Sequence, residues 1–262
     1  ASDVYKRQLL SCAKTMSAVS KVKVPLTTSP RFQKEAAEIA LQMSQFSVDE
    51  LERLLRVNAK IAVENYKRYQ AFHAEATPEL PALLAYTGIV FKRLNPKDFS
   101  AEDFGYAQEH LRLTSFCYGL LRPLDVIRAY RLEGDVVLPE LGNQTLFSYW
   151  RSRLTDTFIE DIRSAGGILC NLASDEMKSL FDWKRVESEV RVVTPEFHVW
   201  KNGKLATIVV YTKMSRGEMT RFILKNKIGN PEELKGFSWE GFEFDESLSD
   251  ERKLVFINGM GE

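Results

Sequence analysis

The first third of the chain carries apolar residues at the spacing of an α-helix. Within residues 31–46, Ala36, Ile39, Ala40 and Met43 fall on one side of such a helix. This spacing predicts a helix that buries one face, and it places the first helical element before any long strand.

Two further helix starts are marked by capping boxes. In this motif a serine hydroxyl accepts from the amide of an acidic residue three positions later, whose carboxylate reaches back to the serine amide. The pairs are Ser47 with Glu50 and Ser100 with Asp103. They predict helices over residues 47–57 and 100–114, and the apolar spacing of Ile61, Ala62, Tyr66 and Tyr69 predicts another over 58–72.

The second half mixes strand and helix patterns. Asn202-Gly203 supplies both positive φ angles of a tight hairpin turn, and the return strand is expected over residues 205–211. An amphipathic helix is predicted over residues 144–164 and a basic one over 215–227. Apolar runs predict strands at residues 168–172, 190–193 and 254–257, and at the end of Leu9-Leu10.

The predicted elements are mostly helices at first, followed by interleaved strands and helices. This order predicts one α/β domain of mixed α+β character, with a mixed sheet and surrounding helices. No linker rich in Gly, Pro or Ser divides it. We assign residues 9–262 to this domain. Residues 1–8 match no element and lack an initiator Met, so we interpret them as a non-native or disordered remnant.

Composition indicates the cellular compartment of the protein but identifies no binding partner. The chain has 262 residues with 36 basic and 36 acidic side chains, so any nucleic-acid site must come from local clustering of charge. The three cysteines are widely spaced, which favours a reducing compartment over a disulfide framework. No apolar run is long enough for a membrane helix. We expect a cytoplasmic protein with no membrane association, for which a monomer is plausible.

A basic segment at residues 107–134 is predicted to form a helix-hairpin-helix, with its turn at Tyr118-Gly119-Leu120. Such a turn presents free backbone amides to phosphate oxygens, and arginines offer a planar fork of donors that matches them. The usual motif has two glycines, and this one has a single Gly. The candidate nucleic-acid contacts here are Arg112, Tyr118, Gly119, Leu120, Arg122, Pro123, Arg128 and Arg131.

Residues 201–227 form the most basic stretch, with Glu218 as their only acid. Lys213, Arg216 and Arg221 are further candidate phosphate contacts, and Gly217 would allow close backbone approach. For both basic segments the alternative is a solvated helix face or arginines in ion pairs.

A small set of polar residues could support catalysis. Lys14 follows the first predicted strand, and Asn171, Ser174, Asp175 and Glu176 follow a buried one, where α/β proteins place their ligand crevice. Ser174 or Asp175 would also serve simply as a helix cap. Cys12 beside Lys14 could be oxidisable, but an ordinary turn is favoured. No metal or cofactor motif is present, and the three histidines lie far apart in the sequence.

At these residues the chain resembles the YaaA family of bacterial peroxide-stress proteins. Ser11-Cys12-Ala13-Lys14-Thr15 is similar to the family's Ser-Pro-Ala-Lys-Thr, and 110–133 to its central motif. Residues 171–176 and 216–223 match two more, in collinear order. There are departures: Cys12 replaces Pro, and Ile89-Val90-Phe91 replaces Asp-Val-Tyr, which removes a carboxylate.

The resemblance implies a one-domain mixed fold, a basic cleft with a helix-hairpin-helix, and binding of duplex or damaged DNA. It also implies a role in limiting hydrogen-peroxide damage, linked to lower free iron. When the family's roles are transferred to the matching positions of this chain, residues 118–123 would form the turn of the helix-hairpin-helix. The residues that would form the basic cleft are Lys14, Lys213, Arg216 and Arg221.

Three functions therefore stay open. DNA binding without metal or cofactor is favoured over catalysis. The alternative is an enzyme acting on a nucleotide or nucleobase, such as a glycosidic hydrolase or lyase, in which a carboxylate works beside a cationic phosphate clamp. An interaction protein with no ligand of its own is the third. The DNA-binding hypothesis requires the distant arginines and lysines to share one concave surface.

Overall fold

The structure is a computed structural model that describes residues 7–259. Its main sheet has the strand order β11-β12-β9-β8-β1-β3-β4, with β10 also paired to β9. β3, β1, β8, β9 and β12 are parallel to their neighbours in that series, whereas β4, β10 and β11 pair antiparallel. The strands are β1 (Arg7–Leu10), β3 (Leu111–Ser115), β4 (Gly119–Leu121), β8 (Ile168–Asn171), β9 (Arg191–Lys201), β10 (Lys204–Ala206), β11 (Phe242–Asp245) and β12 (Lys253–Asn258).

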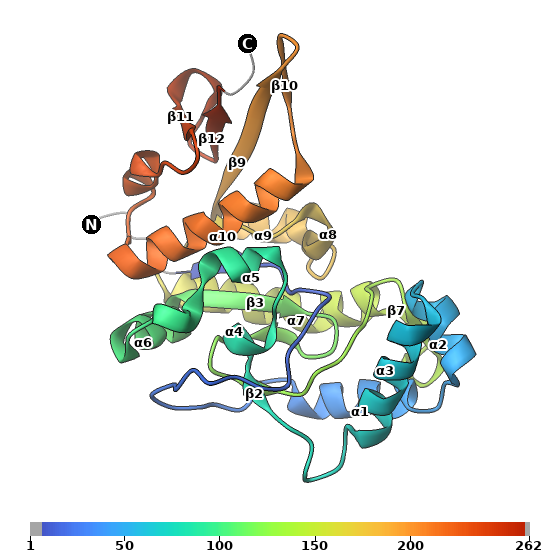
Figure 1. Ribbon diagram of the computed structural model, residues 1–262. Coiled ribbons are helices and arrows are strands. Elements are labelled where there is room, and N and C mark those ends of the chain that lie inside the picture. Colours follow the sequence, from blue (N-terminus) through green and yellow to red (C-terminus); the bar gives the residue numbers. More distant parts are fainter. Residues whose placement is uncertain (1–6, 260–262) are drawn as a thin grey trace.

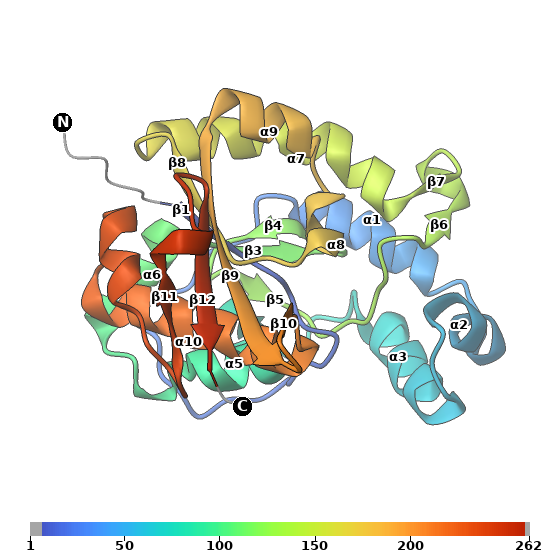
Figure 2. The same ribbon diagram turned by 90° about the horizontal axis from the view of Figure 1, so that it is seen from above.

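Helices cover both faces of this sheet. Figure 2 shows α7 (Leu146–Ser164) and α9 (Trp183–Glu189) on one side, with α5 (Ile89–Leu94) and α10 (Val209–Asn226) on the other. The remaining helices are α1 (Gln33–Met43), α2 (Val48–Leu55), α3 (Ala59–Ala71), α4 (Ala82–Ala85), α6 (Ala101–His110) and α8 (Asp175–Lys178). Two small antiparallel pairs complete the fold: β2 (Leu80–Pro81) with β5 (Val126–Ile127), and β6 (Val137–Leu138) with β7 (Gln144–Thr145).

The predicted mixed α/β architecture is confirmed, and so are its capping signals. Ser47 and Ser100 each form a complete capping box, and the Asn58 side chain caps α3. Helices α1–α3 form a lobe beside the sheet (Figure 1). The Asn202-Gly203 turn has the expected positive φ angles of 53° and 70°.

The expected helix-hairpin-helix is not formed. α6 ends at His110, and residues 111–121 form the β3–β4 hairpin. All five residues of β3 are buried, because the strand pairs in parallel with β1 at the centre of the sheet. Gly119 has φ 71°, and a Cβ there would lie 2.7 Å from the Trp150 ring. Gly119 therefore allows a tight turn of the β-hairpin to pack against α7. It does not form a phosphate-binding loop.

Two boundaries also differ from expectation. β1 begins at Arg7, so Arg7 and Gln8 belong to the sheet, while residues 1–6 lie outside the described part. The return strand after Asn202-Gly203 stops at Ala206, and α10 already begins at Val209. Apolar residues 209–211 are helical because they belong to a helix that packs on β9 and α5.

Candidate functional site

The carboxyl ends of β1 and β8 bring two loops together. The Ser174 amide donates to the Ser11 hydroxyl at 2.8 Å, and the Leu172 amide donates to the Leu9 carbonyl at 2.9 Å. The Cys12 amide donates to the Thr114 hydroxyl of β3 at 3.1 Å. Side chains that follow neighbouring parallel strands thus meet at one edge of the sheet, where ligand crevices of α/β folds lie.

A cavity of about 290 Å³ opens at this edge. Its walls come from residues 10–15, from the start of α5 at 88–90, and from 130–132. Ser174 and Glu176 contribute from the start of α8, and Lys213 and Arg216 from α10. We call it the strand-end cavity. It contains members of four of the sequence segments that carry the family resemblance.

Arg216 is a cation at the wall of this cavity. Within residues 7–259 it forms no ion pair, and its buried Nε has no hydrogen-bond acceptor. Asp175 and Glu196 attract it only through space, and burial lowers the pKa of its guanidinium. A half-buried donor that is left unsatisfied costs free energy, so its position favours an acceptor supplied by a ligand.

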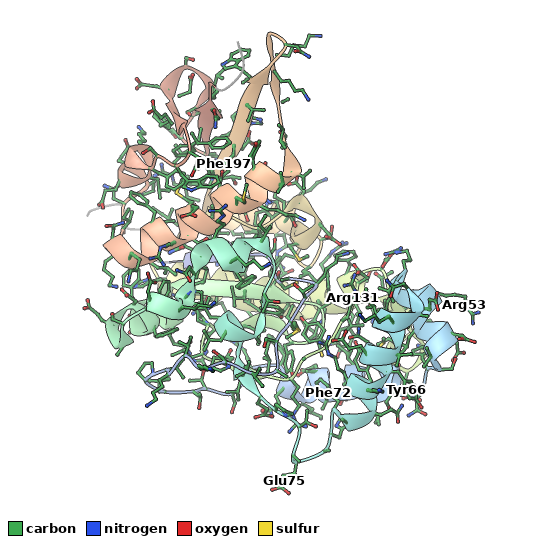
Figure 3. The ribbon with its side chains drawn as sticks, in the orientation of Figure 1. Arg53, Tyr66, Phe72, Glu75, Arg131 and Phe197 are labelled. Carbon is green, nitrogen blue, oxygen red and sulfur yellow. The ribbon has the colours of Figure 1, made fainter. Side chains whose placement is uncertain are left out.

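Lys14 and Arg131 lie on another wall around one buried carboxylate. Lys14 Nζ is 2.7 Å from Glu133 Oε2, and Arg131 Nη2 is 3.7 Å from Glu133 Oε1. The Arg131 Nε is buried without a partner. Figure 3 shows Arg131 between the sheet and the α1–α3 lobe. Arg131 thus belongs to the cavity rather than to a hairpin turn.

The other predicted phosphate contacts are held by carboxylates. Arg112 Nε lies 2.9 Å from Asp161, Arg122 is 3.1 Å from Asp125, Arg128 is 2.9 Å from Glu79, and Arg221 is 2.5 Å from Asp98. Tyr118, Gly119, Leu120 and Pro123 are packed in the β3–β4 region, where the Tyr118 hydroxyl accepts from the Arg128 amide at 3.0 Å. The expectation that all these cations share one surface is wrong.

Their location separates them from the strand-end cavity. Arg112 and Arg122 line a more open cleft together with Arg7, His110 and Lys227. Arg7 begins β1, whereas the strand-end cavity follows its last residue. The two sites therefore lie at opposite ends of the parallel strands. Lys14, Lys213, Arg216 and Arg131 are the predicted cations that the fold does bring together.

Some of the predicted catalytic residues line the strand-end cavity and others do not. Lys14, Ser174 and Glu176 line the cavity. Asp175 is exposed and points to Lys178 at 2.7 Å, a hydrogen bond that lowers the pKa of its carboxyl. Asn171 is buried, and its side-chain oxygen accepts from the Ala173 amide while its Nδ2 has no partner. Ser174 occupies the cap position of α8 but makes no capping hydrogen bond from its side chain.

A chain of buried hydroxyls ends in the cavity, and sequence reasoning did not identify it. The Tyr130 hydroxyl is 2.7 Å from that of Tyr86 and 2.6 Å from that of Ser115. Burial raises the pKa of both tyrosines, so they act as neutral donors. Burial also raises the pKa of the Cys12 thiol to about 12, which keeps it protonated. Ser115 and Tyr130 both lie in the central motif at 110–133, which is the sequence signal that pointed here.

Two kinds of feature are absent from the described residues. Residues 7–259 contain no group of three His, Cys, Asp or Glu side chains placed to hold a metal ion. Among the helices of that same part, none is long and apolar enough to cross a membrane.

The fold and cavity define a mixed α/β protein with a cationic site at the ends of its parallel strands. The family described as peroxide stress protein YaaA matches residues 7–248. A UPF0246 protein of Bacteroides thetaiotaomicron is 99% identical over 254 residues, covering 97% of this chain and 99% of the relative. One from Bacteroides fragilis is 78% identical with 97% and 99% coverage, and one from Crocosphaera subtropica is 37% identical with 95% and 98% coverage. The chain belongs to the YaaA peroxide stress protein family.

Proposed function

We propose that this protein acts in peroxide stress by binding DNA, and that the strand-end cavity holds a phosphate group of that DNA. The proposal rests on Arg216, a guanidinium at the cavity wall whose Nε is buried and unpartnered. Phosphate oxygens are the acceptors that a guanidinium fork matches best.

Neighbouring groups support an anionic ligand. Lys213 precedes Arg216 on the same helix, lines the same cavity and forms no ion pair among residues 7–259. Lys14 Nζ lies at the opposite wall, where Glu133 holds it. Ser174 and Tyr130 add neutral donors to the lining, which also includes the Glu176 carboxylate. The cavity thus offers charge and directed hydrogen bonds to a small, strongly accepting group.

The proposal also explains a local cost in stability. A buried guanidinium without a carboxylate partner destabilises the folded state, because its desolvation is not offset. Perturbed charges of this kind concentrate at functional sites. On this basis Arg216→Gln should keep or raise the melting temperature while it weakens binding.

The test is fluorescence anisotropy of labelled DNA over a series of salt concentrations. For Arg216→Gln we expect affinity to fall about tenfold and the slope of log affinity against log salt to fall by about one, because one phosphate contact is lost. Arg221→Gln is the matched control: it lies on the same helix, but Asp98 already holds it. Unchanged DNA affinity in Arg216→Gln, or equal losses in both variants, contradicts the proposal.

A nucleotide-processing enzyme is the second candidate. It is favoured by one observation, that Glu176, Ser174 and Lys14 line the same cavity as Arg216. A carboxylate beside a cationic clamp can transfer protons while the phosphate is held. Incubation with intact, nicked and base-damaged oligonucleotides, followed by mass spectrometry, tests it. Cleavage that Glu176→Gln abolishes without loss of DNA affinity would establish catalysis, and no product from any substrate would exclude it for those forms.

A further inference from the structure

The β9–β10 hairpin projects beyond the rest of the sheet. β9 pairs with β8 only through residues 191–193, and its later part pairs with β12 and β10 (Figure 1). Phe197 and Val199 are buried, and Figure 3 shows Phe197 between the upper strands and α10. Because side chains alternate along a strand, Glu196, His198 and Trp200 face the other way.

The tip of this hairpin combines exposed apolar and basic side chains. Trp200 and Leu205 are direct cross-strand partners and are 43% and 38% exposed. Lys201 and Lys204 form the next cross-strand pair, beside the Asn202-Gly203 turn, and by the same alternation they lie on the opposite face of the hairpin. We call Trp200, Lys201, Lys204 and Leu205 the hairpin platform. An exposed indole at the end of a projecting hairpin is a feature that favours a binding surface.

The charges of the platform indicate an anionic occupant. Lys201 and Lys204 lie directly opposite each other, an arrangement of like charges that destabilises a hairpin. Within residues 7–259 neither lysine forms an ion pair. A phosphate between or beside the two ammonium groups relieves their repulsion, so the pair is better suited to a polyanion than to a neutral peptide.

The face that carries Trp200 leads toward the strand-end cavity. Glu196 lies on this face of β9 and attracts Arg216 of the cavity wall. His198, between Glu196 and Trp200, is 3.2 Å from the Glu196 carboxylate and 3.1 Å from the Thr207 hydroxyl. Glu196 is an acid on this path, and a DNA strand that follows it must pass beside this carboxylate.

We propose that the hairpin platform binds a single-stranded segment of DNA that crosses the hairpin tip, with a base stacked on Trp200 on one face and the adjoining phosphates beside Lys201 and Lys204 on the other. This inference rests on the proposed function, because it makes the strand continuous with the phosphate in the cavity. Bases of an intact duplex are stacked on one another and unavailable to an indole, whereas an unpaired base offers its whole face.

The experiment compares a labelled single strand with the duplex of the same sequence, in anisotropy titrations of the full chain. The wild type should bind the single strand more tightly. Trp200→Ala should weaken single-strand binding about tenfold and leave duplex binding unchanged, since one stacked base is lost. Trp200→Phe should recover part of the loss. Trp183→Ala is the control: its ring also lies near a lysine, but its Nε1 donates to Glu187 at 2.8 Å.

Each alternative result separates the two proposals. Equal losses for both DNA forms, or no loss, in Trp200→Ala overturns the hairpin platform while leaving the cavity proposal in place. A change of oligomeric state in Trp200→Ala, seen by sedimentation, also overturns it, because the indole then serves contact between copies. Full binding by Arg216→Gln with a selective loss in Trp200→Ala overturns the cavity proposal and supports the platform.

Discussion

Basic side chains lie at both ends of the parallel strands, but their pairing with carboxylates differs between the two ends. At the amino ends, Arg7 and Arg112 both contact the Asp161 carboxylate, at 2.8 and 2.9 Å. At the carboxyl ends, Arg216 has no ion pair within residues 7–259, and Lys213 has none either. The amino-end arginines are engaged in holding the structure together, so availability for a ligand depends on pairing rather than on the number of cations.

This contrast gives a direct way to assign each basic residue. A paired arginine should matter for stability and little for DNA affinity, because removing it leaves a carboxylate without its partner. An unpaired one should matter for affinity and little for stability. The free energy of unfolding and the DNA affinity of single variants therefore distinguish the two ends.

The largest effect is expected at the amino ends. Arg112 is 7% exposed, binds Asp161 of α7 and donates to the Leu111 carbonyl, so Arg112→Ala should lower the free energy of unfolding by about 3 kcal/mol. Urea denaturation of the variant and the wild type measures this change in the free energy of unfolding. Arg163→Ala on the same helix is the control: its pair with Glu189 is exposed, and the change should be at most about 0.5 kcal/mol. DNA affinity of the folded Arg112→Ala protein should equal that of the wild type, and a clear fall would break the contrast.

A smaller effect is expected where α10 is anchored beside Arg216. A Cβ at Gly217 would lie 2.3 Å from the Val90 carbonyl oxygen of α5. Gly217→Ala should therefore push the helices apart, lower the free energy of unfolding by about 2 kcal/mol and weaken DNA binding. Gly105→Ala, in α6 with nothing within 4 Å, should instead raise stability by about 1 kcal/mol. Thermal unfolding of the two variants distinguishes close packing from helix propensity.

The smallest effect concerns the interior of the strand-end cavity. Burial raises the pKa of Cys12 from 9.0 to about 12, so folding keeps a proton that the unfolded chain releases. This stability is complete below about pH 9 and is lost as pH rises toward 12. Between about pH 8 and 10, Cys12→Ala should lose about 1 kcal/mol less than the wild type. Identical pH dependence would mean that water reaches the thiol and that the cavity is more open than its lining indicates.

The local pattern of the sequence was sufficient for several elements. Ser47 and Ser100 cap helices where predicted, and Asn202-Gly203 turns the β9–β10 hairpin. These signals act over a few residues, through hydrogen bonds and φ angles that a short peptide can already satisfy. The mixed α/β class followed from the order of such elements, and the family from motifs that occur in collinear order.

Long-range contacts decided the rest. Residues 111–121 have no local signal that separates a helical hairpin from a β-hairpin; pairing with β1, about a hundred positions earlier, makes them strands. Ion pairing was also beyond the sequence, because Asp161 and Asp98 lie far along the chain from Arg112 and Arg221. The sequence by itself determined which cations exist and which helices begin where. Only the tertiary structure decided which of those cations a carboxylate neutralises and that Arg216 is not among them, since electrostatic pairing depends on distances in space.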